Sequence, residues 1–208
     1  MNEDDLTFEI FRPFGPPIFK TRIPDTMINK MNNYSEEIIK DKDKGKQLSH
    51  GDSLAGNVTQ EFSLEESFVK DSGWLNLLNI VSNHALKAMT GQEIEKITVN
   101  ATWIVRQFQY EYNPLHSHTG NISGVAYLKV PKNLGDTVQK KNPTRNKNGK
   151  IIFVHGSTQF LSKALIGFTP AVGDFYLFPS YLLHLVYPYY DTQEERRSVS
   201  FNANLILK

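Results

Sequence analysis

The sequence of 208 residues contains no cysteine. The absence of thiols excludes disulfides, thiolate metal sites, iron–sulfur clusters and cysteine nucleophiles together. A metal ion held by this chain would therefore need ligands of the histidine and oxygen types.

A large charge of one sign is also absent, since the formal net charge is +1. Lys and Arg are dispersed except near residue 140, so nucleic acid is not an expected partner. No apolar run approaches the roughly 18 residues that a membrane-spanning helix needs, and the N-terminal segment Met1–Asp5 is acidic. We therefore expect a soluble, cytoplasmic protein with no membrane partner.

The sequence has enough apolar residues for the hydrophobic core of one domain, since 39% of its residues are apolar and 12% are aromatic. Helical patterns come first along the chain. One helix is expected to begin at Pro24-Asp25, and another from Trp74 to a closing Gly91. The charged run Lys40–Gly45 between them is expected to be solvated and mobile.

Strand patterns follow the helices. They cover Ile97–Tyr112, Ser123–Val130, Lys150–Val154, Asp174–Phe178 and Ser198–Leu207. Before the helices, an irregular edge strand and turn is expected over Phe8–Arg22. Helices followed by strands predict an α+β protein with helices backing a mostly antiparallel sheet system. The polar, basic segment 132–150 is expected to be a long loop, either a disordered insertion or a lid over a substrate.

Three histidines form a candidate metal site. His116 and His118 follow a long strand, and residues two apart in extended backbone project from the same face, roughly 6.5–7 Å apart. His184 follows an aromatic strand and could supply a third ligand. Three ligands on one face leave coordination positions open, as in mononuclear iron sites that admit substrate and oxygen.

The last predicted strand offers an anion site. Arg196, Ser198 and Ser200 alternate with a mostly apolar face that includes Val199 and Phe201. A guanidinium matches a carboxylate in geometry, and Ser198 can add a hydroxyl. A solvent-exposed sheet face is the alternative, but the upstream histidines favour a pocket for an anion.

The order of these motifs carries a resemblance. The sequence resembles the Fe(II)- and 2-oxoglutarate-dependent oxygenases in the order of five motifs. These are His-x-His at 116–118, Ser123–Leu128, Gly173-Asp174 to Phe178-Pro179-Ser180, His184 and Arg196–Asn202. The resemblance spans about residues 97–207 and is closest to the prolyl-hydroxylase-like branch found in marine bacteriophages.

The resemblance implies a double-stranded β-helix, or jelly roll, in one domain over 1–208. Residues 1–95 would be a helical support region and 96–208 the jelly-roll core, with a flexible basic loop near 132–150. His116 and His184 would bind iron, Arg196 would pair with the distal carboxylate of 2-oxoglutarate and Ser198 would support it. Tyr110, Tyr112 or Tyr127 could line the same pocket.

The implied reaction is oxidative decarboxylation of 2-oxoglutarate to succinate with hydroxylation of an unactivated C–H bond. Its cofactors would be Fe(II) and 2-oxoglutarate, with O2 as oxidant and ascorbate as a candidate reductant. A peptide or protein, modified at proline, is the first substrate hypothesis. A phage-encoded protein would act in the host cytoplasm.

One position departs from the family pattern, which has Asp or Glu two residues after the first histidine where this chain has His118. His118 could bind iron as a third imidazole, a carboxylate such as Glu111 or Asp174 could replace it, or water could fill the position. We favour His118, because a dianionic co-substrate could offset the greater positive charge.

Two other function classes remain open at this stage. One is a non-catalytic jelly-roll module that binds a small carboxylate or sugar. This alternative rests on the absence of the acidic metal ligand at position 118. The other is a cupin-like enzyme that uses three histidines, although it would not require Arg196 and Ser198 at this spacing.

Overall fold

The computed structural model describes residues 7, 9–11, 15–50, 56–136 and 145–208. Its helices are α1 (Asp25–Lys40), α2 (Lys42–Gln47), α3 (Glu66–Asp71) and α4 (Trp74–Thr90). Its strands are β1 (Glu9–Phe11), β2 (Ile18–Arg22), β3 (Gln60–Ser63), β4 (Ile94–Gln107), β5 (Asn113–His116), β6 (Ile122–Lys129), β7 (Ile151–Val154), β8 (Leu165–Phe168), β9 (Asp174–Pro179), β10 (Leu183–Val186) and β11 (Arg196–Leu207).

The strands form two antiparallel sheets. The larger has seven strands in the order β1-β2-β9-β6-β11-β4-β3, and the smaller has four in the order β5-β10-β7-β8. Apolar side chains join the facing surfaces, among them Tyr127 and Tyr176 from the larger sheet and Phe153 from the smaller. Two facing antiparallel sheets of this kind fit a jelly-roll type of fold.

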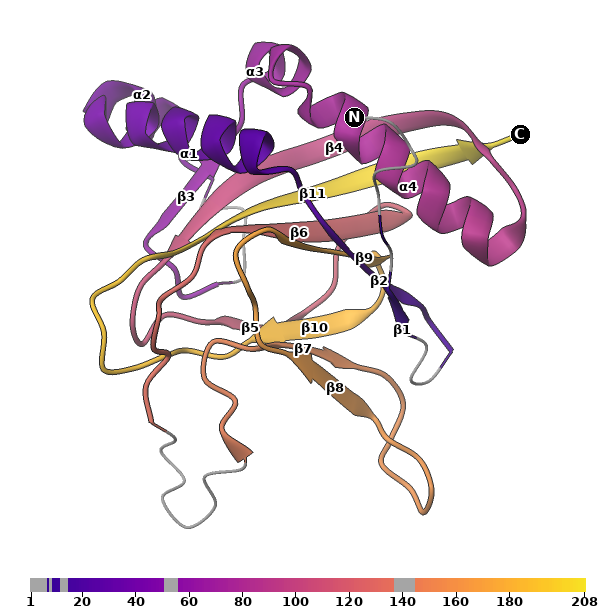
Figure 1. Cartoon of the computed structure of the whole chain (residues 1–208). Coiled ribbons are helices and arrows are strands. Elements are labelled where there is room, and N and C mark those ends of the chain that lie inside the picture. The colour runs from indigo at the N-terminus through magenta and orange to yellow at the C-terminus, as the bar shows by residue number, and fades with distance from the viewer. Residues whose placement is uncertain (1–6, 8, 12–14, 51–55, 137–144) are drawn as a thin grey trace.

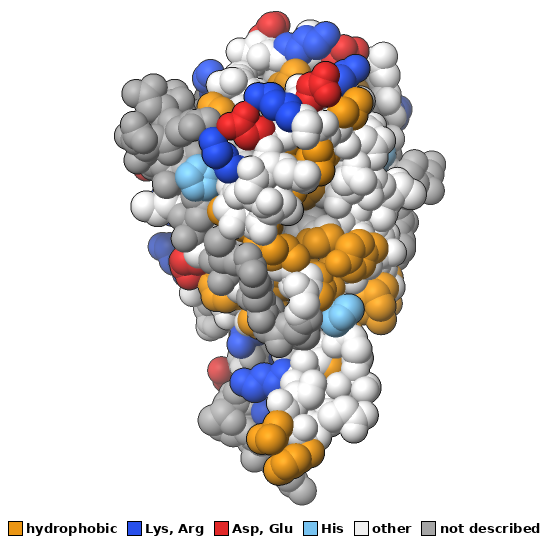
Figure 2. Space-filling view, turned by 90° about the vertical axis from the view of Figure 1, so that its right-hand side faces the viewer, with side chains coloured by type: hydrophobic (Ala, Val, Ile, Leu, Met, Phe, Trp, Pro, Cys, Tyr) orange, Lys and Arg blue, Asp and Glu red, His pale blue; other side chains and the backbone are white. Residues whose placement is uncertain are grey.

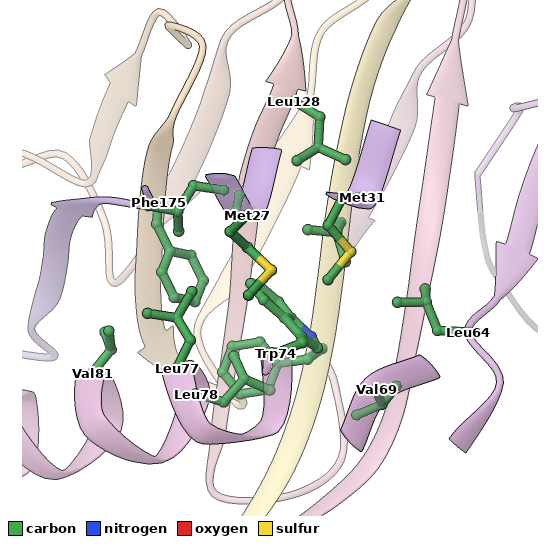
Figure 3. Packing of buried hydrophobic residues seen from close by; sticks show 14 of the residues in the cluster. Met27, Met31, Leu64, Val69, Trp74, Leu77, Leu78, Val81, Leu128 and Phe175 are labelled. Carbon is green, nitrogen blue, oxygen red and sulfur yellow. The ribbon is translucent and has the colours of Figure 1, made fainter. Parts of the chain in front are cut away.

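The other face of the larger sheet meets the helices, as Figure 1 shows. Trp74 is fully buried at the start of α4, and its ring centroid lies 5.7 Å from that of Phe175 on β9. Figure 3 shows Met27 and Met31 of α1 beside Trp74 and Leu77 in this layer. The main apolar core therefore lies between helices and sheet, on the side away from the smaller sheet.

The helix predictions are confirmed at both long helices. α1 begins at Asp25, and Gly91 ends α4 in the left-handed region with φ 73°. The segment Lys42–Gln47 has no buried residue, as expected of a solvated run, but it forms a helix that was not predicted. Asp41 accepts hydrogen bonds from the backbone N–H groups of Asp43 and Lys44, which caps α2 at its N-terminus.

All five predicted strand regions are occupied by strands, but β3, β5, β8 and β10 were not predicted as separate strands. The alternation along β11 is confirmed. Val199 and Phe201 join the core beneath the helices, whereas Arg196 and Ser198 face the space between the sheets. Residues 137–144 of the predicted basic loop lie outside the described residues.

Two asparagine side chains link the described parts of the loop, and Asn146 donates to the carbonyl oxygen of Gly135 at 3.1 Å. The Asn148 amide nitrogen donates hydrogen bonds to the carbonyl oxygens of Leu134, Gly135 and Asp136 at 3.0–3.1 Å. These contacts tie the two flanks of the segment together next to β7. The division of the chain into 1–95 and 96–208 stays a prediction.

One side of the molecule separates charged from apolar surface. In Figure 2, basic and acidic side chains gather at the top of this face and apolar side chains gather across its middle. None of the helices in the described part of the chain combines the length and the apolar character of a membrane span.

Candidate metal and anion site

Two strands of the smaller sheet bring the three predicted histidines together. β5 pairs with β10 so that His116 lies directly opposite His184. His118 follows β5, and its backbone N–H donates to the carbonyl of Ser180 at 2.9 Å, which fixes the turn. One ligand atom from each of the three imidazoles lies within 4.8 Å of the others.

Hydrogen bonds to the backbone orient two of these rings. His116 Nδ1 lies 2.6 Å from the carbonyl oxygen of Pro114, and His184 Nδ1 lies 2.9 Å from that of Leu182. A carbonyl oxygen can only accept, so each Nδ1 carries the proton and each Nε2 keeps a free lone pair. This is the arrangement in which a metal-binding histidine is held by a second hydrogen bond.

Burial keeps two of the imidazoles neutral. It lowers the pKa of His184 to about 3, with the nearby His116 as a smaller cause, and lowers the pKa of His118 to about 4 for the same reasons. Neutral imidazole is the form that binds a metal, so these two side chains need lose no proton at pH 7.

The spacing of the three nitrogens fits a single ion. A metal–nitrogen bond of about 2 Å allows two ligands of one ion to be at most about 4 Å apart; the nitrogens here lie within 4.8 Å of one another, so ring shifts of less than about 1 Å bring all three to one ion. Within the described ranges, this is the only group of three or more metal-ligating side chains in mutual reach.

The two carboxylates considered as alternative ligands are engaged elsewhere. Glu111 accepts hydrogen bonds from Thr59 Oγ1 at 2.7 Å and from the Phe108 N–H at 2.8 Å. Asp174 accepts from the Ala171 N–H at 3.0 Å, as a turn residue does, and from the Tyr176 hydroxyl at 3.1 Å. Neither belongs to the histidine group.

A cavity of about 190 Å³ opens beside the histidines, between the two sheets. One row of paired residues crosses its floor on the larger sheet, running from Glu61 on β3 to Val105 on β4, Ser198 on β11 and Tyr127 on β6. All four residues of this row line the cavity, as does Arg196. The predicted metal and anion residues therefore share one space.

Arg196 is buried without a counter-ion. Its side chain donates to the carbonyl of Gly149 at 3.0 Å, and its guanidinium lies 5.2 Å from the centre of the Tyr127 ring. Among the described residues, no carboxylate lies within ion-pairing distance of it. The residue is only 3% exposed, so a permanently charged group faces the cavity with its charge uncompensated.

Tyr127 adds an unused polar atom at the same place. Its hydroxyl is buried and has no hydrogen-bond partner within the described part of the chain, and burial raises its pKa. A buried hydroxyl without a partner is costly. Together with Ser198 and Arg196, it forms a set of donors that fits the carboxylate of a small anion.

Two other tyrosines proposed for the pocket lie away from it. Tyr110 is 62% exposed, its ring packs against Tyr190 at 5.5 Å, and it does not line the cavity. Tyr112 is also exposed. The expectation that Tyr110 binds the co-substrate therefore loses its geometric basis, and Tyr127 alone of the three faces the cavity.

The cavity also contains residues that the sequence did not single out. Glu61, Trp103 and Asn113 line it, and Trp103 packs edge-on against His118 at 5.9 Å. Glu61 is only 3% exposed, and burial, with Glu111 as a smaller cause, raises its pKa to about 7. The available signal was the alternation of Glu61 and Ser63 with Phe62 and Leu64, which is too short to identify a strand by itself.

Comparison with protein families places this site in context. A family model described as "Putative 2OG-Fe(II) oxygenase" matches residues 101–202. The matched range contains His116, His118, His184, Arg196 and Ser198. None of the curated proteins gives a significant sequence match.

Solved structures share the fold at low sequence identity. A Pseudomonas putida prolyl-4-hydroxylase is similar with TM-score 0.52 and 13% identity, over 96% of this chain and 94% of that one. The viral collagen prolyl hydroxylase of Paramecium Bursaria Chlorella virus-1, in its 2-oxoglutarate complex, gives 0.53 and 13% over 96% and 97%. HygX from Streptomyces hygroscopicus, with nickel, 2-oxoglutarate and hygromycin B bound, gives 0.57 and 11% over 97% and 84%.

The family match over residues 101–202 supports a 2OG-Fe(II) oxygenase, and the solved structures show the shared fold. An oxygenase of this kind uses Fe(II), 2-oxoglutarate and O2, and the three-histidine group fits the metal among them. The uncompensated Arg196 and the unpartnered Tyr127 hydroxyl fit the dicarboxylate.

Proposed function

We propose that the protein is an Fe(II)- and 2-oxoglutarate-dependent dioxygenase that hydroxylates an unactivated C–H bond, at a prolyl residue of a polypeptide. The observation that carries the proposal is a buried arginine without a counter-ion in the same cavity as three imidazoles with ligand atoms in mutual reach. A structural metal site would not need an uncompensated cation next to it.

In this proposal His116, His118 and His184 hold the metal. Fe(II) bound there with 2-oxoglutarate would supply the activation of O2, with succinate, CO2 and the hydroxylated substrate as products. Hydrogen bonds to the carbonyls of Pro114 and Leu182 keep Nε2 of His116 and His184 directed to the ion. His118 takes the place of the usual carboxylate, and the dianionic co-substrate offsets the added charge.

The anion site orients the co-substrate. The Arg196 guanidinium would pair with its distal carboxylate, and the hydroxyls of Ser198 and Tyr127 would donate to the same group. The cavity walls then exclude water from this ion pair, since Arg196 and Ser198 are each only 3% exposed. Exclusion of water strengthens the attraction between the two charges.

A polypeptide substrate is supported by the shared fold with two prolyl hydroxylases. The relation to the bacteriophage branch, ascorbate as reductant and a cytoplasmic location remain expectations from the resemblance. The single domain over 1–208, with a flexible basic loop near 132–150, is likewise part of the proposal.

An anaerobic titration tests the metal and co-substrate together. We expect a weak visible charge-transfer band that requires both Fe(II) and 2-oxoglutarate, because the co-substrate must bind the metal directly. His184→Ala should abolish metal retention and the band, whereas His155→Ala, which changes an exposed histidine outside the cavity, should keep both. Absence of the band in folded wild-type protein would contradict the proposal.

A second measurement separates catalysis from binding alone. After air is admitted, succinate release with a mass gain of about one oxygen on a proline-containing peptide supports the hydroxylase. A band without succinate release under any condition would favour the non-catalytic module. Metal binding without any response to 2-oxoglutarate would favour three-histidine chemistry of another kind.

A further inference from the structure

The cavity contains two hydrogen-bond acceptors that the proposed reaction does not use, Glu61 Oε2 and Asn113 Oδ1, together called the acceptor wall. Glu61 Oε2 and Asn113 Oδ1 are both buried, and neither has a hydrogen-bond partner within the described ranges. Both residues line the cavity beside His116 and His118. A Cβ at position 56 would collide with Asn113 Oδ1, so Gly56 leaves the room that this amide occupies.

The acceptor wall lies apart from the anion site. Glu61 pairs with Val105 on β4, and Val105 pairs with Ser198 on β11. Neighbouring strands are about 4.8 Å apart, so the Cα atoms of Glu61 and Ser198 are about 10 Å apart across the sheet. The cavity therefore has a cationic end at Arg196 and an acidic side chain, Glu61, at the other end.

A structural role does not account for Glu61. Another buried carboxylate, Glu195, is paired with Arg106 at 2.8 Å and with Arg197 at 2.6 Å. Glu61 forms no such ion pair among the described residues, and the neighbouring charge that raises its pKa is another carboxylate, Glu111. A buried carboxylate oxygen that faces a cavity and has no hydrogen-bond donor from the protein can be satisfied by a donor group of a bound ligand.

We propose that Glu61 selects a substrate with a positively charged nitrogen, an ammonium or guanidinium group near the C–H bond that reacts. An ammonium offers three donors and a guanidinium five, enough to satisfy both Glu61 and Asn113. A lysyl or arginyl residue beside the target proline of a polypeptide has this chemistry. The reaction at the C–H bond rests on the proposed function, whereas recognition of the cation does not.

Matched ligands test this recognition directly. The probes are the N-acetyl amides of lysine and arginine, each compared with a neutral analogue of similar size, norleucine and citrulline respectively. Binding is measured by calorimetry to the full chain with Fe(II) and 2-oxoglutarate under anaerobic conditions. We expect at least one cationic probe to bind about tenfold or more tightly than its neutral analogue, since charge-assisted hydrogen bonds to a buried carboxylate are strong.

Two variants decide whether Glu61 is responsible. Glu61→Gln keeps the size of the side chain and removes its charge, so the preference for the cationic probe should disappear. Glu95→Gln removes the same charge from an exposed position outside the cavity and should keep the preference. Circular dichroism reports whether each variant is folded.

The outcomes separate this inference from the proposed function. If no probe binds, if cationic and neutral probes bind equally, or if Glu61→Gln retains the preference, the inference is wrong. The charge-transfer band in the same wild-type samples reports the co-substrate site independently. A band without cation preference overturns the substrate class alone, and cation preference without a band overturns the oxygenase alone.

Discussion

Adjacent arginines on β11 offer the sharpest test, because they face opposite sides of the larger sheet. Arg196 faces the cavity without a carboxylate partner in the described structure, whereas Arg197 is fully buried on the helix side. Arg197 pairs with Glu195 at 2.6 Å and with Glu36 at 2.8 Å. Substitution of each by methionine should therefore have opposite effects on the protein without ligands.

The magnitudes follow from the partners. Removal of one member of a buried ion pair costs about 3–5 kcal/mol, and Glu195 keeps Arg106 as a partner, so Arg197→Met should cost about 3 kcal/mol. For a chain of this length each kcal/mol shifts Tm by about 2–4 °C, so we expect a decrease of about 6–12 °C. Arg196→Met removes an uncompensated charge and should leave stability unchanged or raise it by up to about 2 kcal/mol.

Affinity for 2-oxoglutarate should show the reverse order. Loss of one partner of a buried charge pair in a complex costs about 2–5 kcal/mol, and each 1.4 kcal/mol is tenfold in Kd. Arg196→Met should therefore weaken 2-oxoglutarate binding by about 30-fold or more. Arg197→Met, measured at a temperature where it is folded, should keep Kd within a few-fold of the wild type.

Thermal unfolding of metal-free protein, followed by near-ultraviolet circular dichroism, gives the stabilities. Anaerobic titration of the Fe(II) form with 2-oxoglutarate gives the affinities. The reasoning is refuted if Arg196→Met destabilises the ligand-free protein as much as Arg197→Met does, because Arg196 would then be a structural residue. Unchanged co-substrate affinity in Arg196→Met would require another anion site.

Three further changes have defined outcomes. Burial places the folded-state pKa of His184 near 3, below its unfolded value of about 6.5, so protonation of this group favours the unfolded chain as pH falls below about 6.5. A decrease from pH 7 to pH 5 should therefore lower the free energy of unfolding of the metal-free protein by about 2 kcal/mol. Denaturant titrations should show this part of the pH dependence missing in His184→Gln. Tyr127→Phe removes a hydroxyl with no partner, so it should leave the Tm of the ligand-free protein nearly unchanged but weaken 2-oxoglutarate binding, measured by the same titration, by about tenfold or more, the value of a hydrogen bond to a charged group. Gly124→Ala would place a Cβ 2.6 Å from Phe201 and 2.8 Å from the Tyr176 carbonyl, so overpacking should lower stability by about 1–3 kcal/mol in thermal unfolding; an unchanged Tm would show that β6 can shift.

The sequence predicted those parts of the fold in which local pattern and tertiary environment agree. Apolar positions at helical spacing identified α1 and α4, and Gly91 marked the end of α4 because it adopts a left-handed conformation there. The run that forms α2 contains mainly charged residues and no apolar face. Its helix depends on the Asp41 cap and on the ion pair of Lys44 with Glu65 at 2.8 Å, which joins segments far apart in the sequence.

The candidate site was predictable where its residues lie two apart on extended backbone. His116 with His118, and Arg196 with Ser198, follow this rule, and His184 meets His116 because β10 pairs with β5. The register of strand pairs distant in sequence is not encoded locally.

Glu61 shows the consequence for the other cavity residues. Its place depends on β3 joining the edge of β4, and a four-residue strand carries too little pattern to predict that. Tyr110 was proposed for the pocket from the sequence, but β4 ends at Gln107, and Tyr110, with a φ of 71°, does not line the cavity.

Strand β11 contributes alternate side chains to the cavity between the sheets and to the core beneath the helices. In the first part of the strand Arg196, Ser198 and Ser200 line the cavity, and the alternate residues Val199, Phe201 and Ala203 pack in the core beneath the helices. Insertion or deletion of a single residue within this strand would move every side chain beyond that point to the opposite face of the sheet. Apolar side chains would then face the cavity, and a guanidinium would face the core beneath the helices. Length differences among related chains should therefore collect in the connections on either side of β11, while the strand itself keeps its phase.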